Sequence, residues 1–228
     1  MSAPNRMGLF DLLRENPPPL VEQAFEHVES MLEDGNHMFA ASAACALDNE
    51  ILSIDLHALD KDINQREQKL RRAVLEHLTI DPQREMVFSL KLVSIVHEAE
   101  RIGDITKSLV KARHIAHEPR MGPWVEPLRD LRDRILVMFE HAKQGFVEEN
   151  VEAARTLMAM HESIKDDVTA YLQHLADAED ITANEGIVYA LIAHLLSRVS
   201  SHLSNIASVV ALPFDQIRRA HGSDNASA

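Results

Sequence analysis

One sequence pattern occurs twice in this chain, and the repeat constrains the fold more than any other feature. Residues 97–104 (His-Glu-Ala-Glu-Arg-Ile-Gly-Asp) align with residues 194–201 (His-Leu-Leu-Ser-Arg-Val-Ser-Ser) at an offset of 97. Earlier in each half, residues 59–64 (Leu-Asp-Lys-Asp-Ile-Asn) align with residues 160–165 (Met-His-Glu-Ser-Ile-Lys) at an offset of 101. We therefore expect two halves that fold alike, with the histidines that begin the first pattern in equivalent positions.

Composition favours helices over strands. Of the 228 residues only seven are glycine and 4% are aromatic, while 46% are hydrophobic, which is enough to build a buried core. The nine prolines leave two long proline-free stretches, 20–81 and 128–212, in which helices can run without interruption. We expect six helices, at 20–46, 50–78, 82–116, 125–144, 148–176 and 183–211. The pair Asp81-Pro82 is typical of a helix start.

The expected architecture is all-α, with two tandem antiparallel three-helix bundles. A break that contains two prolines and a glycine, residues 117–124, separates the halves. Three helices bury too few of their own sides, so we expect the two bundles to pack side by side. The predicted parts are an N-terminal arm (1–19), a first repeat (20–116), a second repeat (125–212) and a C-terminal tail (213–228).

Charge and cysteine content exclude several classes of partner. The net charge is −13, so nucleic acid and anionic lipid surfaces should be repelled. No apolar run approaches the ~20 residues that span a bilayer, so we expect no membrane insertion. The single cysteine, Cys45, cannot form an internal disulfide, and no leader pattern is present. We therefore expect a cytoplasmic protein.

Acidic side chains form a stripe on the third predicted helix. His97, Glu100 and Asp104 follow one another at steps of three and four, which places them on one helical face. Apolar residues continue this line toward the start of the helix and predict a row that faces the core: Met86, Leu90 and Val93. Carboxylates beside a core must be protonated, paired with a cation or bound to a metal, because an unpaired buried charge is costly.

The second predicted helix offers an opposing acidic face. Asp60, Asn64 and Glu67 share one side of it. Oxygen ligands from two helices together with an imidazole suit Fe, Zn, Mn or Mg. The candidate metal ligands are Glu100, Asp104, His97, Asp60 and Glu67. The alternative is an ordinary surface, on which Arg101 holds Glu98 or Asp104 in a salt bridge worth less than about 1 kcal/mol.

The sequence Glu-Arg-Ile-Gly-Asp at 100–104 resembles the signature of the PhoU family, helical proteins of bacterial and archaeal phosphate control that carry Glu-or-Asp-x-x-x-Asp once in each of two repeats. In the second copy Arg198, His202 and the run 205–207 (Asn-Ile-Ala) fit the family's usual Arg-x-Gly-Asp-His-x-x-Asn-Ile-Ala ending. Serines replace the two carboxylates there, at positions 197 and 201. The resemblance covers about 28–212.

The resemblance implies metal ions at the acidic motif, and only Glu100 and Asp104 match that motif. A serine hydroxyl is a poor metal ligand at neutral pH, so we expect metal in the first repeat only.

We also expect a homodimer, because the third helix carries apolar residues on a second face: Leu92, Ile95, Ala99 and Ile102.

The function that the resemblance implies is regulatory. A PhoU-like protein would control phosphate uptake and phosphate signalling by docking on a phosphate transporter component or a sensor kinase at the cytoplasmic membrane face. One alternative is a helical metal-storage or metal-sensing protein, and another is a helical scaffold with no small ligand. The chain has no Cys-x-x-Cys, His-Glu-x-x-His, glycine-rich phosphate loop or Gly-x-Ser-x-Gly, so we expect no enzyme.

Overall fold

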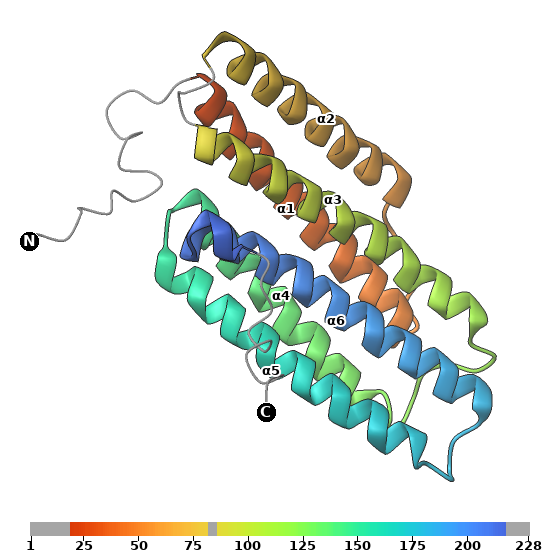
Figure 1. Cartoon of the computed structure of the whole chain (residues 1–228). Helices are drawn as coiled ribbons and strands as arrows, with labels where there is room; N and C mark the ends of the chain where they lie inside the picture. Colours follow the sequence, from red (N-terminus) through yellow and green to blue (C-terminus); the bar gives the residue numbers. More distant parts are fainter. Residues whose placement is uncertain (1–18, 82–85, 218–228) are drawn as a thin grey trace, which may run out of the picture.

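The computed structural model describes residues 19–81 and 86–217, and within these ranges every long element is an α-helix. The elements are α1 Pro19–Leu47, α2 Leu56–Ile80, α3 Met86–Ile115, α4 Glu126–Val147, α5 Val151–Ala176, α6 Ala183–Ala211 and the short 3-10 helix η1 Phe214–Gln216. The six α-helices lie along one common direction, with α1 to α3 above α4 to α6 in Figure 1. The predicted all-α fold of two antiparallel three-helix units is confirmed.

Some sequence predictions fall outside the described residues. These are the arm at 1–19 apart from Pro19, the tail beyond residue 217, and the helix start at Pro82. Asp81 is described, and it ends α2, because its N–H donates to the carbonyl of His77. How the chain divides into domains stays a prediction.

The second helix begins at Leu56, later than the predicted residue 50. The carboxylate of Asp55 accepts hydrogen bonds from the backbone N–H groups of His57 and Ala58, both at 3.0 Å. An aspartate in this role satisfies donors that have no partner in the first helical turn, and so fixes the start of the helix.

The first helix of each half ends in the same way. Asn49 and Glu149 both have left-handed backbone conformations, with φ of 62° and 56°. The N–H of Asp48 donates to Ala44 at 2.8 Å, and the N–H of Glu148 donates to Gln144 at 3.2 Å. All of these pairs are separated by 100 residues, which extends the repeat to α1 and α4.

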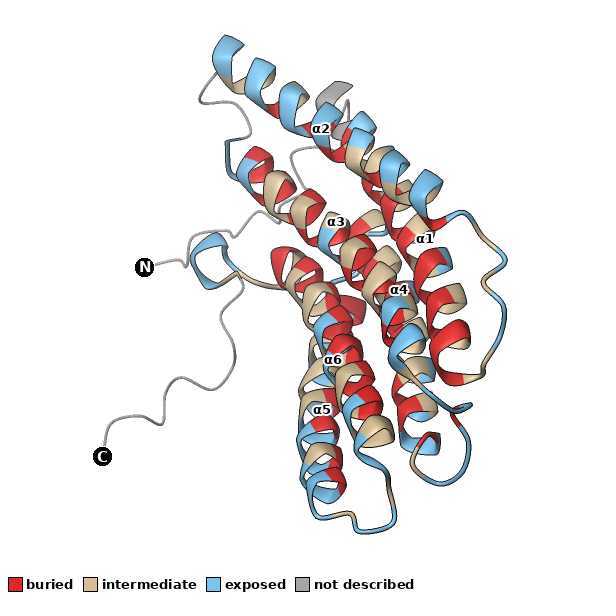
Figure 2. Cartoon of the chain, turned by 90° about the vertical axis from the view of Figure 1, so that its right-hand side faces the viewer, coloured by how far each residue is buried: buried red, intermediate tan, exposed pale blue. Residues whose placement is uncertain are grey.

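The central helices of the bundle are α3 and α6. α3 packs on α1, α2 and α6, and α6 packs on α3, α4 and α5. Figure 2 shows buried residues along the inner faces of both helices. The apolar face of α3 that the sequence assigned to a dimer contact lies inside the chain: Leu92, Ile95, Ala99 and Ile102 are each 1% exposed. This face therefore gives no basis for a dimer.

Met86 and Leu90, the first two residues of the apolar row on α3, do not face the core, contrary to the prediction, whereas Val93 is partly buried and packs against the core. Met86 is 46% exposed and Leu90 is 41% exposed. The same helical line holds Glu100 and Asp104 further along, and those side chains lie on the side of α3 that faces α2. Because only α2 covers this side, while α1 and α6 cover the others, the row is left partly open.

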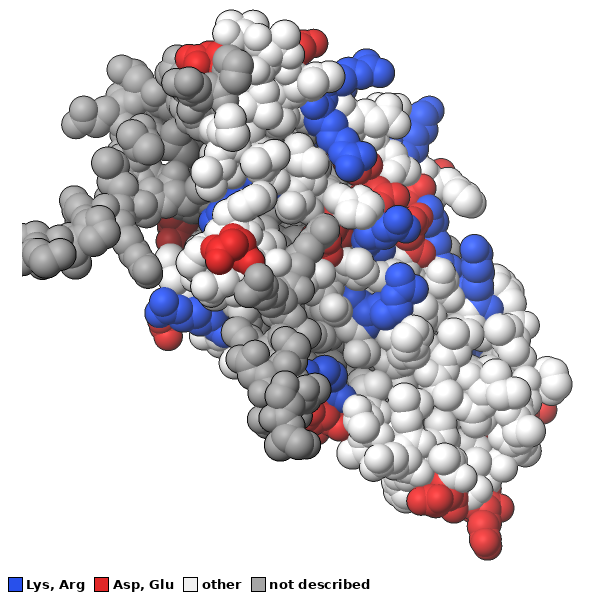
Figure 3. Space-filling view, viewed as in Figure 1, with Lys and Arg blue, Asp and Glu red and all other residues white. Residues whose placement is uncertain are grey.

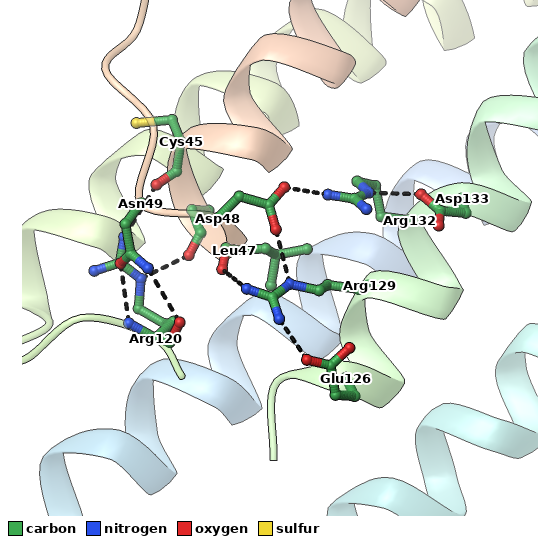
Figure 4. A network of polar contacts seen from close by, with 10 residues as sticks. Cys45, Leu47, Asp48, Asn49, Arg120, Glu126, Arg129, Arg132 and Asp133 are labelled. Atoms are coloured by element: carbon green, nitrogen blue, oxygen red, sulfur yellow. Dashed lines mark hydrogen bonds and ion pairs between the residues drawn. The ribbon is translucent and has the colours of Figure 1, made fainter. Parts of the chain in front are cut away.

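Arg120, in the segment between α3 and α4, ties the two halves together (Figure 4). Its guanidinium is buried and donates to the carbonyl oxygens of Ala46 at 2.8 Å and Cys45 at 3.0 Å. Its main-chain N–H and carbonyl both bond to the side chain of Asn49. A cation placed at these carbonyls satisfies the last turn of α1 and interacts favourably with its dipole.

Two arginines from α4 complete this contact. Arg129 donates to the carbonyl of Leu47 at 3.1 Å and to the carboxylate of Asp48 at 2.7 Å, and Arg132 also pairs with Asp48 (Figure 4). The end of α1 is thus held by charged side chains from the second half.

None of the helices in the described part of the chain has both the length and the apolar content needed to cross a bilayer.

Candidate functional site

Four carboxylates and a histidine lie between α2 and α3, and we call them the α2–α3 cluster. The cluster consists of the predicted ligands Asp60, Glu67, His97, Glu100 and Asp104. Figure 3 shows basic and acidic side chains intermingled over this part of the surface. The side chains of Glu67 and Glu100 are 12% and 18% exposed, whereas that of Asp104 is 42% exposed. The structure therefore places all five predicted residues in one region.

The ammonium of Lys107 lies inside the cluster. Its Nζ is 2.7 Å from Oδ1 of Asp60 and 3.0 Å from Oδ1 of Asp104, so it bridges α2 and α3. Burial by itself would lower the pKa of Lys107, but the hydrogen bonds to the two carboxylates outweigh it and raise the pKa. The sequence did not predict this contact, although the three-residue spacing from Asp104 allows it.

The other carboxylates are neutralised less completely. Oε1 of Glu67 is 3.4 Å from an Arg71 guanidinium nitrogen and 3.8 Å from Nδ1 of His97. Oε2 of Glu100 lies 3.9 Å from Nε of Arg101. Burial raises the pKa of Glu100, and the nearby negative charges raise it further, while Arg101 acts in the opposite direction. The ionised form of Glu100 is therefore disfavoured at this position relative to a glutamate in water.

A metal ion that joined α2 and α3 at this cluster would have to compete with an ammonium. The two oxygens that face each other across α2 and α3, from Asp60 and Asp104, already share an ammonium. In the described ranges, no three His, Cys, Asp or Glu side chains are grouped so that they could hold a metal. Metal binding by the cluster stays a prediction.

The second half has a neutral contact at the matching place. His161 is the equivalent of Asp60, and its Nδ1 lies 2.9 Å from Oγ of Ser200, the equivalent of Gly103. In the first half, a Cβ on Gly103 would lie 3.6 Å from Oδ1 of Asp60. The same two positions therefore meet in both halves, as the offsets of 101 and 97 require.

Ser200 and His161 do not form a nucleophile and its base. The hydroxyl of Ser200 donates to the carbonyl of Ser197 at 2.8 Å, so Nδ1 of His161 is the donor in the other hydrogen bond. Ser200 is fully buried. Burial lowers the pKa of His161, and Lys165 lowers it further, while Glu162 opposes them. The pair is thus a neutral link between α5 and α6.

A reversed salt bridge gives further evidence for the repeat. Asp34 of α1 pairs with Arg66 of α2 at 2.6 Å, and Arg134 of α4 pairs with Asp167 of α5 at 2.6 Å. The aspartate and the arginine exchange helices between the halves, while the position of the bridge is kept.

Glu98 joins the two halves. It is 3% exposed, and its Oε2 lies 2.7 Å from Nδ1 of His202 and 2.9 Å from Nδ2 of Asn205, both on α6. Glu98 is therefore a buried contact between the halves and not the surface partner of Arg101 that the sequence suggests. Spacing within one helix gives no signal for a contact between helices that are about a hundred residues apart.

Comparison with known proteins supports the motif resemblance. No family model matches the chain. The chain is 25% identical over 132 residues to the Phosphate-specific transport system accessory protein PhoU homolog 1 of Thermotoga maritima, a match that covers 56% of each chain. The chain thus spans about half the length of this relative. The resemblance to PhoU proteins is confirmed.

Solved PhoU structures have the same fold. PhoU from Streptococcus pneumoniae matches with a TM-score of 0.69 at 18% identity, over 84% of this chain and 94% of that one. PhoU from Pseudomonas aeruginosa matches with a TM-score of 0.63 at 19% identity, over 88% of this chain and 96% of that one.

The two copies of the repeated pattern depart from the PhoU signature in complementary ways. The first copy keeps both acids but has Ile105 and Ser108 where the family ending has His and Asn. The second copy keeps His202 and Asn205 and has lost the acids. Since His202 and Asn205 bind Glu98 of the first half, the remnants of both copies meet between α3 and α6.

Proposed function

We propose that this chain is a non-enzymatic regulator of phosphate uptake and phosphate signalling. The observation that carries the proposal is its similarity to PhoU proteins both in sequence, to a relative named as a phosphate-specific transport system accessory protein, and in fold. The engagement of the Ser200 hydroxyl with a helix carbonyl, which leaves no activated nucleophile at that pair, supports a role without catalysis.

In this proposal the protein works by binding another protein. It acts in the cytoplasm at the membrane face, where it docks on a phosphate transporter component or on a sensor kinase. The high negative charge supports a protein partner over nucleic acid or an anionic lipid surface. Asp60 and Asp104 of the α2–α3 cluster are paired with Lys107 and Arg101 of the same chain, which supports a structural or docking role for that region.

Direct binding tests this proposal. The purified full chain is titrated by calorimetry with the cytoplasmic component of the phosphate transporter and, separately, with the cytoplasmic part of the phosphate sensor kinase of the same organism. We expect saturable binding to at least one of them with Kd of about 10 μM or tighter. The matching component of an unrelated transporter is the control. Absence of binding to both phosphate proteins would contradict the proposal.

We also propose a homodimer, a prediction that has lost the apolar face of α3 as its basis. Sedimentation equilibrium over a range of concentrations distinguishes the two states. A mass near 51 kDa, twice the 25.6 kDa of the chain, supports the dimer, and a mass of one chain throughout contradicts it.

A further inference from the structure

We propose that Lys107 is the built-in cation of the α2–α3 cluster and that its ammonium excludes divalent metal ions from this cluster. The geometry gives the first reason. Nζ of Lys107 makes one contact to each of the two helices, with Asp60 at 2.7 Å and with Asp104 at 3.0 Å. A metal ion that joined these two carboxylates would need the place where the ammonium lies.

Partial burial strengthens the ion pair between Lys107 and Asp60. The side chains of Lys107 and Asp60 are 24% and 17% exposed, so solvent screens their attraction less than it does for a surface pair. The stem of Lys107 is anchored on α3 and its head group contacts both helices. To enter, a metal ion would have to displace a bound ammonium and also lose part of its own hydration.

The second half of the chain provides an internal comparison. In the second half, neutral polar residues stand at the positions equivalent to Asp60, Glu100 and Asp104. The position equivalent to Lys107 is also occupied by a neutral polar residue. The replacements are His161, Ser197, Ser201 and Ser204. At these matched positions the ammonium is present where the carboxylates are present and absent where they are absent, as expected for a cation that belongs to the set. The ion pair of the second half, between Lys165 and Glu162, occupies other positions.

The remaining charges explain why the exclusion depends on Lys107. Arg101 approaches Asp104 only to 3.6 Å and Glu100 only to 3.9 Å, and it is half exposed. Without Lys107, Asp60 and Asp104 would keep no close ammonium, and Glu100 lies near both of them. Asp60 and Asp104 are hard oxygen ligands, and an ion such as Mn²⁺ or Mg²⁺ can be held by one or two carboxylates while it keeps several of its waters. Loss of Lys107 would open the place between these two carboxylates to such an ion.

The proposal is tested with purified full-length protein and MnCl2 at pH 7.5, after treatment with a chelator. Calorimetry measures affinity and stoichiometry, and the Mn²⁺ electron paramagnetic resonance signal measures free ion. We expect no saturable binding of Mn²⁺ by the wild type up to about 1 mM. Lys107→Met should bind one ion per chain with a Kd of about 0.1 mM or lower, at least roughly tenfold below that limit. The double variant Lys107→Met with Asp104→Asn should lose this gain.

Lys111→Met is the matched control, because Lys111 lies one turn further along α3 and is exposed. It should behave like the wild type. If circular dichroism shows that Lys107→Met does not fold, Lys107→Gln takes its place. Micromolar one-to-one binding of Mn²⁺ by the wild type would overturn the proposal without any variant, and so would a Lys107 variant that folds and gains nothing. Neither result depends on the proposed role in phosphate control.

Discussion

Nδ1 of His161 lies 2.9 Å from Oγ of Ser200, at the two positions that Asp60 and Gly103 occupy in the first half. The contact between the second and third helices of each half has thus been kept in place while its chemistry has changed. In the first half it contains carboxylates and an ammonium, and in the second half a neutral imidazole and a hydroxyl. The halves share a fold but not an electrostatic character.

Because burial lowers the pKa of His161 below 6.5, we expect the neutral ring to favour the folded state. This stability is fully present above pH 6.5 and is lost as the pH falls through that value toward the lowered pKa of the folded protein. His161→Gln, which has no titrating group, should lose less stability than the wild type between pH 7.5 and pH 5.5.

Urea unfolding at both pH values measures the difference. His194→Gln is the control, since His194 is exposed on α6. Equal pH dependence of the wild type and His161→Gln would rule out a contribution from this ring.

Arg120→Ala should lower the free energy of unfolding by about 2 to 4 kcal/mol, because the buried carbonyls of Ala46 and Cys45 would lose a charged donor. Guanidinium chloride denaturation measures this loss. Arg155→Ala is the control: Arg155 is 64% exposed, and its contact with Glu152 is 3.8 Å long, so a change below about 0.5 kcal/mol is expected. Equal effects of the two substitutions would show that Arg120 does not hold the end of α1.

Glu100→Gln should stabilise the protein at neutral pH. Burial and the neighbouring carboxylates raise the pKa of Glu100 above 4.5, so its ionisation disfavours the folded state as the pH rises through the raised value. At pH 7.5 the melting temperature of the variant should exceed that of the wild type by up to about 4 °C. Near pH 4, where the carboxyl is largely protonated in both states, the difference should vanish.

Glu76→Gln, at an exposed position of α2, is the matched control and should leave the melting temperature unchanged. A variant at Glu100 that melts lower than the wild type at pH 7.5 would show that this carboxylate is stabilised by its neighbours.

The six helices could be predicted because proline placement and helix-forming composition act within each segment. Proline placement and composition do not predict the late start of α2, because that start depends on a single capping residue, Asp55. The orientation of Met86 and Leu90 was wrong because a helical line shows which residues share a face but not how many neighbours cover that face.

The members of the α2–α3 cluster could be predicted because helical spacing fixes which side chains share a face. Its balance of charge could not, because that balance depends on Lys107 reaching across to Asp60 on another helix. The link from Glu98 to His202 was missed for the same reason, since it crosses from one half of the chain to the other.

Phosphate uptake by living cells tests the proposed regulatory role most directly. Uptake of radioactive phosphate is measured at high and at low external phosphate in the wild type, in cells that lack this protein, and in cells to which the full chain has been returned. We expect uptake in the deficient cells to stop responding to external phosphate, and the response to return with the chain. The same response to external phosphate in the wild type and in the deficient cells would contradict the account.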